Sequence, residues 1–264
     1  MAGLEKTALE LREVDSEMER IEDFIGNHVA NAAAEVAVVG LSGGIDSATV
    51  LGLCSRALGS ERVRGVFMPG EGTPDEDLEA AIQIAETFGV SCEEIPISGI
   101  VEQFASCLPD LDRISLANVK VRTRMVLLYA ISNQLNGLVL GTGNLSEWAL
   151  GYFTKYGDGA ADISPVLHLY KLELYQIAEA LNLPRRVIEK EPSAGLWDSQ
   201  TDREELGAGY EVLDPILYCK KELGLPASEA AEKLGRRKKL VQDIYDRVEQ
   251  NEHKRKLPPR LERK

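Results

Sequence analysis

The stretch VAVVGLSGGIDS (Val36–Ser47) joins a short, valine-rich apolar run to a polar turn that contains two glycines. An apolar run without alternation is typical of a strand that is buried on both faces, as in a parallel sheet. The residues from Ala48 to Leu58, closed by Gly59, predict the helix that follows the turn. A buried strand, a glycine-rich turn and a helix in this order predict the first βα unit of an α/β sheet.

The pattern of strand and helix repeats along the first 165 residues. An amphipathic helix is expected within residues 4–30, and Thr73, Pro74 and Glu76 form a helix start with Thr73 as the cap, which Gly89 ends. The alternation implies right-handed βαβ units, so the predicted fold is α/β with a doubly wound, mainly parallel sheet flanked by helices. Further strands are predicted at Val63–Met68, Cys92–Ile97 and Leu138–Asn144, and a long helix at Ala117–Leu135.

Beyond Pro165 the pattern becomes helical. The segment Glu191–Asp202 has no clear period, which predicts a mobile loop. We expect one domain over residues 1–264, with the core sheet at about 30–170 and a helical C-terminal part at about 171–264. Its helices are predicted at Lys171–Leu181, Tyr210–Glu222, Ser228–Leu234 and Arg236–Asn251.

The composition limits the function. The chain has 264 residues, is 44% hydrophobic and carries a formal net charge of −13. This acidic balance argues against a nucleic-acid binder, which would carry an excess of basic residues. An anionic substrate would need a local cationic pocket, because the net charge of the protein repels it.

Neither the cysteines nor the N-terminus indicates export or a membrane. Cys54, Cys92, Cys107 and Cys219 form no CxxC pair and have no zinc-ligand spacing, so we expect reduced, mostly buried thiols. The charged N-terminus lacks the apolar core of a signal peptide. No apolar run approaches the roughly 20 residues that span a bilayer. We therefore expect a cytoplasmic protein.

The turn Ser42–Ser47 has the composition of an anion-binding loop. Gly43 and Gly44 let backbone N–H groups turn inward, the two serines add hydroxyl donors, and the following helix adds its positive dipole end. A carboxylate beside bound phosphates is repulsive unless a cation lies between them, so Asp46 is a candidate Mg²⁺ ligand. The alternative is that Asp46 only caps the helix and the glycines only form a turn.

Four segments resemble known proteins. SGGIDS (Ser42–Ser47) looks like the loop of the N-type ATP pyrophosphatases, which cleave ATP between the α and β phosphates. Three further segments resemble NAD synthetase in that superfamily: NVKVRTRM (Asn118–Met125), GTGNLSEWALGYFTKYGDGAADISPV (Gly141–Val166) and HKRKLPP (His253–Pro259). This resemblance implies a C–N ligase that converts nicotinic acid adenine dinucleotide (deamido-NAD) to NAD with ammonia. The reaction would pass through an adenylate, release AMP and pyrophosphate, and need Mg²⁺.

The resemblance also implies an ATP site. Asp46 and Glu147 would hold Mg²⁺, and Lys171 would contact the phosphates of ATP. From the residues alone, Glu147 could equally be a solvated acid and Thr142 a helix cap, and composition alone favours an ordinary exposed lysine at Lys171. The ATP site predicted from the loop and the resemblance comprises Gly40, Leu41, Ser42, Gly43, Gly44, Ile45, Asp46, Ser47, Thr142, Lys171 and Ser193.

The other expected residues concern the second and third substrates. By resemblance, Asp158 lies near the ammonia, where an acid could hold ammonium or accept its proton. From the residues alone, residues 152–162 could be a surface turn, and the basic residues near the C-terminus could be merely solvated. The catalytic set is then Asp46, Glu147, Asp158 and Lys171, and the residues implied to bind deamido-NAD are Arg122, Lys155, Asp162, His253 and Lys254.

Some features leave the function open. Bacterial family members carry an arginine by the adenine after the second strand, where this chain has Phe67 and Met68, so the base contacts are not predicted. The length leaves no room for a glutaminase domain, so ammonia is the expected nitrogen source. The resemblance implies a homodimer. Alternatives are another N-type ATP pyrophosphatase, such as a GMP synthetase-like amidase or a tRNA thiolase, and a non-catalytic ATP-binding module.

Overall fold

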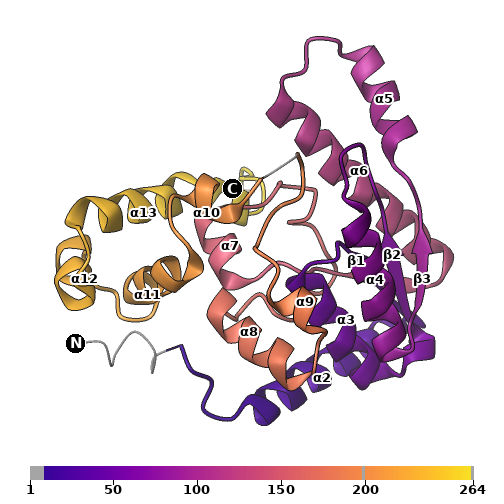
Figure 1. Ribbon diagram of the computed structural model, residues 1–264, viewed down its shortest axis with the longest axis horizontal. Coiled ribbons are helices and arrows are strands. Elements are labelled where there is room, and N and C mark those ends of the chain that lie inside the picture. Colours follow the sequence, from indigo (N-terminus) through magenta and orange to yellow (C-terminus); the bar gives the residue numbers. More distant parts are fainter. Residues whose placement is uncertain (1–8, 198–199, 263–264) are drawn as a thin grey trace.

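The computed structural model describes residues 9–197 and 200–262 (Figure 1). Its strands are β1 (Val36–Leu41), β2 (Val63–Phe67), β3 (Ser91–Glu94) and β4 (Gly137–Leu140). The helices of the first part are α2 (Val14–Asn31), α3 (Ile45–Leu58), the 3₁₀ turn η1 (Ser60–Arg62), α4 (Asp75–Phe88), α5 (Ser98–Cys107), α6 (Arg113–Gln134) and α7 (Leu145–Leu150). Those that follow are α8 (Lys171–Ala180), α9 (Arg185–Ile188), α10 (Asp202–Leu206), α11 (Tyr210–Lys221), α12 (Ala227–Leu234), α13 (Lys238–Gln250) and α14 (Glu252–Arg255).

The four strands form one parallel sheet in the order β3-β2-β1-β4. In the middle strand, Val39 pairs with Gly65 of β2 and with Leu140 of β4. Ala37 and Val38, beside it in β1, have no exposed surface. The prediction of a strand buried on both faces is therefore confirmed, and the carboxyl ends of all four strands meet at one edge of the sheet.

Helices cover both faces of the sheet (Figure 1). On one face, α2, α3, α4 and α8 enclose a core that includes Ile25, Leu51 and Ile177. On the other face, Val101 of α5 and Met125 of α6 pack with Val38 of β1. This arrangement confirms the predicted α/β fold with a doubly wound parallel sheet.

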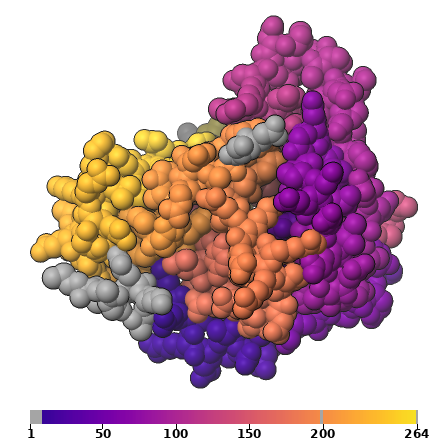
Figure 2. Space-filling view, in the orientation of Figure 1, coloured from indigo at the N-terminus to yellow at the C-terminus, as the bar shows by residue number. Residues whose placement is uncertain are grey.

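The C-terminal helices have a core of their own. Leu213 and Ile216 of α11 pack with Val241 of α13 in a cluster that is separate from the two sheet cores. Figure 2 shows this yellow part on one side of the molecule and the purple sheet part on the other, with the orange chain around α8 and α9 between them. The helical C-terminal part is confirmed, whereas the single domain over 1–264 stays a prediction.

Several predicted boundaries were wrong. Thr73 does not cap α4, because its Oγ1 accepts the N–H of Gly70 at 3.0 Å, and the helix begins at Asp75 with Pro74 in the cap position. The helix predicted at Ala117–Leu135 is α6, and it begins one turn earlier, where the Asp112 side chain accepts the N–H of Ser115 at 2.7 Å. Short helices such as α5 and α7 were not predicted, because six to ten residues show too little periodicity.

The remaining sequence expectations have mixed outcomes. In the predicted helix 4–30, residues 4–8 lie outside the described part, and α2 begins only at Val14. All four cysteines are free thiols, but only Cys54 and Cys219 are buried, and Cys107 is exposed. Within residues 9–197 and 200–262, no helix is both long enough and apolar enough to cross a membrane.

Candidate functional site

The turn between β1 and α3 is held together by its own side chains. Ser47 Oγ donates to the carbonyl of Gly44 at 3.1 Å and accepts the N–H of Ser42 at 3.2 Å. Gly43 has φ +74°, and a Cβ there would lie 2.6 Å from the carbonyl oxygen of Asp77. Glycine is therefore required at this position. The turn places the N-terminus of α3, and with it Asp46, at the carboxyl edge of the sheet.

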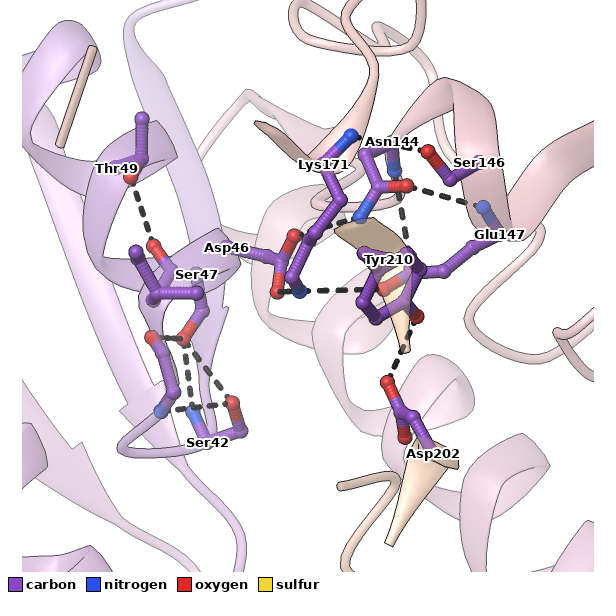
Figure 3. A network of polar contacts seen from close by, with 12 residues as sticks. Ser42, Asp46, Ser47, Thr49, Asn144, Ser146, Glu147, Lys171, Asp202 and Tyr210 are labelled. Carbon is purple, nitrogen blue, oxygen red and sulfur yellow. Dashed lines mark hydrogen bonds and ion pairs between the residues drawn. The ribbon is translucent and has the colours of Figure 1, made fainter. Parts of the chain in front are cut away.

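A buried lysine lies between two carboxylates at this edge (Figure 3). The Lys171 side chain is 2% exposed, and its Nζ pairs with Asp46 Oδ2 and lies 3.6 Å from Glu147 Oε1. The same ammonium lies 5.3 Å from the centre of the Tyr210 ring. The three predicted residues Asp46, Glu147 and Lys171 thus form one cluster, although they come from α3, α7 and α8.

Asn144 positions both carboxylates. Its Oδ1 accepts the N–H of Glu147 at 3.0 Å, which caps α7, and its Nδ2 donates to Asp46 Oδ1 at 2.8 Å. The Glu147 carboxylate accepts the Asn144 N–H at 3.3 Å in return, so the two residues form a capping box. Sequence reasoning missed Asn144, although an Asn followed three residues later by a Glu is the pattern that marks such a box.

The charges of the cluster depend on one another. Burial, together with the nearby Asp46 carboxylate, raises the pKa of Glu147, and the Lys171 ammonium lowers it by a smaller amount. Burial alone would lower the pKa of Lys171, but Asp46 and Glu147 raise it by more, so that its pKa lies above the ordinary value. Lys171 is therefore a permanent cation at neutral pH.

The two carboxylates fit the magnesium ion that the resemblance implies. Oxygens of Asp46 and Glu147 already converge on a position held by a cationic group, the Lys171 ammonium. Mg²⁺ in nucleotide sites is typically bound by one or two carboxylates together with substrate phosphates and water. In the described part of the chain, no group of three or more His, Cys, Asp or Glu residues could hold a metal ion.

The cluster forms part of the wall of a large cleft of about 1290 Å³. Phe67 and Met68 also line the cleft, so the end of β2 presents apolar side chains to it. The predicted site residues that line it are Gly40, Leu41, Ser42, Gly44, Ile45, Asp46, Ser47, Thr142, Glu147, Asp158, Lys171, Ser193 and Lys254.

The other five predicted residues, all in the described part, are not among those that line the cleft. Gly43 acts through its backbone turn, and Arg122 Nε donates to the carbonyl of Lys155 at 3.3 Å. Lys155 Nζ donates to the carbonyl of His253 at 2.7 Å, which ties this lysine to the C-terminal segment. Asp162 accepts the N–H of Val139 at 2.8 Å. The structure thus brings Arg122, Lys155 and His253 together outside the cleft, and Asp162 lies apart from them at β4.

Asp158 is exposed on the cleft surface, and its carboxylate accepts the N–H of Thr154 at 2.8 Å. The protein around the cleft desolvates this carboxylate and raises its pKa above the ordinary value, although Lys254 and Arg124 act in the opposite direction. An acid with a raised pKa that faces a cleft has the properties of a group that exchanges protons with a ligand.

Further residues of the cleft were not found from the sequence. Asp202 is 4% exposed, and its Oδ2 accepts the hydroxyl of Tyr210 at 2.8 Å. The guanidinium of Arg113, at the start of α6, lies 4.3 Å from the ring centre of Trp197 and so connects α6 to the segment 191–197. These residues come together only through the tertiary structure, and no short motif marks them.

Comparisons with known proteins show the family of this chain. The profile of the family described as NAD synthase matches residues 17–258. The NH(3)-dependent NAD(+) synthetase of Archaeoglobus fulgidus is 48% identical over 243 residues, which cover 92% of this chain and 94% of that protein. The corresponding enzyme of Thermococcus kodakarensis is 46% identical, over 91% of this chain and 94% of that protein.

Solved structures give the same result. NMN synthetase from Francisella tularensis has a TM-score of 0.83 and 32% identity, over 94% of this chain and 98% of that one. NH3-dependent NAD synthetase from Campylobacter jejuni, in complex with the nitrate ion, has a TM-score of 0.81 and 33% identity, over 96% and 100% of the two chains. Since the profile and the relatives span almost the whole chain, this protein belongs to the NAD synthase family.

Proposed function

We propose that this chain catalyses the ATP-dependent amidation of deamido-NAD to NAD with ammonia, and that it releases AMP and pyrophosphate. The observation that carries the proposal is the convergence of Asp46, Glu147 and Lys171 beside the Ser42–Ser47 turn. Retention of ATP alone does not require two carboxylates placed for a metal. The near-complete alignment with NH(3)-dependent NAD(+) synthetases supports the choice of acceptor and of nitrogen source.

The chemistry has two steps. In the first, an oxygen of the nicotinate carboxylate forms a bond to the α phosphorus of ATP, and the bond from that phosphorus to the β phosphate breaks. The N–H groups of the Ser42–Ser47 turn and the ammonium of Lys171 stabilise the charge on the departing pyrophosphate. Asp46 and Glu147 would hold Mg²⁺, which supplies charge neutralisation and polarises the phosphoryl group when bound.

In the second step ammonia attacks the carbonyl carbon of the acyl adenylate, and the C–O bond to AMP breaks. Asp158 accepts a proton from the attacking nitrogen, a role that its position on the cleft and its raised pKa support. Ser193 and Thr142 contact the nucleotide. Deamido-NAD is bound by Lys254 within the cleft and, beyond it, by Arg122, Lys155, Asp162 and His253.

The protein acts as a cytoplasmic homodimer. Several large apolar side chains are exposed on α5, which projects from the body together with the start of α6 (Figure 1), and along α6 itself, and a second copy would cover them. We expect light scattering to give twice the mass of the chain and to give the monomer mass for Val126→Glu. The exposed apolar residues are Ile100, Phe104, Leu108, Ile114 and Val126.

One assay tests the reaction. The purified chain is mixed with ATP, Mg²⁺ and deamido-NAD, and ammonium or glutamine is added separately. We expect NAD and pyrophosphate in equal amounts with ammonium and little NAD with glutamine. Asp46→Asn should lower the rate about 100-fold or more while circular dichroism shows an unchanged fold. NAD formed equally well from glutamine would contradict the nitrogen source.

A second candidate acceptor is favoured by one structural neighbour. The Francisella tularensis protein is an NMN synthetase and aligns over 98% of its length. The corresponding mononucleotide acid is therefore the alternative substrate. A comparison of kcat/KM for the two acceptors decides between them. A higher value for the mononucleotide would replace deamido-NAD as the proposed substrate.

A further inference from the structure

A carboxylate without a role in the reaction lies in the core of the C-terminal helices. Asp214 of α11 has no exposed surface, and it stands between Leu213 and Pro215 in an apolar stretch. Burial raises the pKa of Asp214 to about 7. Burial of a carboxylate costs free energy unless hydrogen bonds satisfy it, so the partners of Asp214 indicate what the residue does at this position.

Both oxygens of Asp214 have partners from the site. Oδ1 accepts the hydroxyl of Ser146 at 2.5 Å, and Oδ2 accepts the N–H of Leu172 at 2.9 Å. Ser146 Oγ accepts in turn the N–H of Lys171 at 2.9 Å. Ser146 precedes Glu147 in α7, and Leu172 follows Lys171 in α8.

The contacts satisfy a helix end that would otherwise be buried and unpaired. The first N–H groups of a helix have no partner within the helix. In α8, Ser146 satisfies the N–H of Lys171, and Asp214 satisfies that of Leu172. A carboxylate at this end is also favoured by the helix dipole. Asp214 therefore links the first turns of α7 and α8 to α11.

We propose that Asp214 is a positioning residue for the amidation site, which acts through Ser146 to set the place of the Lys171 ammonium relative to the Glu147 carboxylate. The inference rests on the proposed function for its activity readout. Asp214 does not touch the nucleotide turn, because its hydrogen bonds go to Ser146 and Leu172 and its carboxylate is fully buried. Its loss should therefore weaken only those properties that depend on Lys171 and Glu147.

Two variants and a control separate positioning from mere stability. Asp214→Asn keeps the volume but cannot accept from both donors, and Ser146→Ala removes the hydroxyl link. The control Ile216→Val shortens a fully buried side chain on the same helix that is not among those lining the cleft. For each protein, kcat is measured, ATP affinity is measured by calorimetry with Mg²⁺ and with EDTA, and the melting temperature is recorded.

The expected result is a split between readouts. Asp214→Asn and Ser146→Ala should each lower kcat about 10-fold and weaken ATP binding, with a larger loss in Mg²⁺ than in EDTA, because Mg²⁺ binding depends on Glu147 as well as on the place of Lys171. The double variant should lose little more than either single one, because the two residues act as one unit. Ile216→Val should keep the kcat of the wild type.

Other outcomes overturn the inference. If both single variants keep kcat and Mg²⁺–ATP affinity and only melt earlier, Asp214 is structural. Losses that multiply in the double variant would mean that Asp214 does not act through Ser146. If Asp214→Asn does not fold, Ser146→Ala decides alone. A wild type that makes no NAD would refute the proposed function instead, and the calorimetry would still decide this inference.

Discussion

The Ser42–Ser47 turn and the junction between the sheet part and the C-terminal helices contribute to the same site in different ways. In the turn, Ser42 and Ser47 are five residues apart and bond mainly to each other and to the backbone between them. At the junction, Ser146 meets Asp214 across 68 positions, and Lys171 meets Asp46 across 125. A short segment can thus prepare a place for phosphate, whereas the charges around it are placed by the whole fold.

Helix α8 connects these two regions. Its residues Leu174 and Ile177 pack in the core of the sheet part, and Leu172 packs against the core of the C-terminal helices. Lys171, at its start, pairs with carboxylates of α3 and α7. We therefore expect substitutions at this junction to lower activity or the unfolding free energy more than similar substitutions within either part.

The largest effect on activity is expected for Lys171→Met. The variant leaves Asp46 and Glu147 facing each other without a cation, so kcat should fall about 100-fold or more and the unfolding free energy by about 2 kcal/mol. Added Mg²⁺ should raise the melting temperature of the variant more than that of the wild type, because the ion replaces the lost cation.

The control for this prediction is Lys239→Met. Lys239 pairs with Asp243 on the surface at 3.4 Å and its side chain is 87% exposed, so its loss should change stability by less than about 0.5 kcal/mol. Equal effects of the two substitutions on melting would mean that the two carboxylates do not depend on Lys171.

The second effect is expected for Gly151→Ala, at the end of α7, and it falls on stability. Gly151 has φ +66°, and a Cβ there would overlap the side chain of Asn251. We expect a loss of about 3 kcal/mol in urea unfolding, from backbone strain and overpacking together. Gly235→Ala is the matched control, because Gly235 has φ +62° and no atom within 4 Å of its added Cβ.

Gly235→Ala should lower the unfolding free energy by only about 1 kcal/mol, because it introduces backbone strain without a steric overlap. The difference between the two glycine variants measures the contact between α7 and the C-terminal segment. If both variants lose the same unfolding free energy, the Asn251 side chain moves aside without cost. The junction then does not differ from the interior of the helical part.

The smallest effect concerns pH and Glu173. This residue accepts the N–H of Tyr170 at 2.8 Å at the start of α8. Burial, together with Glu17 and Glu222, raises its pKa to about 7 from 4.5. The folded state thus binds the proton more tightly than the unfolded state, so the contribution is complete below pH 4.5 and is lost as the pH rises to about 7.

Glu173→Gln tests this sign, because glutamine does not titrate. Denaturant unfolding of both proteins at several pH values should show the wild type losing stability relative to the variant across that interval, with no further change above it. A constant difference would show that the Glu173 carboxyl does not titrate differently in the folded state.

The sequence allowed some of the site to be predicted and hid the rest. Asp46 and the glycines were found because they stand together in one turn after a buried strand. Glu147, Lys171 and Asp158 needed the family resemblance, since the surroundings of each residue in the sequence are ordinary. Asn144 could have been found from its capping pattern, and Asp214 from its place in an apolar stretch.

The sequence by itself determined the parallel sheet, the turn that follows its first strand and the two-part plan of the chain. These depend on local patterns of apolar residues and on glycines that few other residues can replace. Only the tertiary structure decided that Lys171 would be buried between Asp46 and Glu147. It also decided that Asp214, from a distant part of the chain, would bond to the first turns of α7 and α8. The reason is physical: burial and charge pairing depend on which surfaces meet after folding, and no short stretch of sequence contains that information.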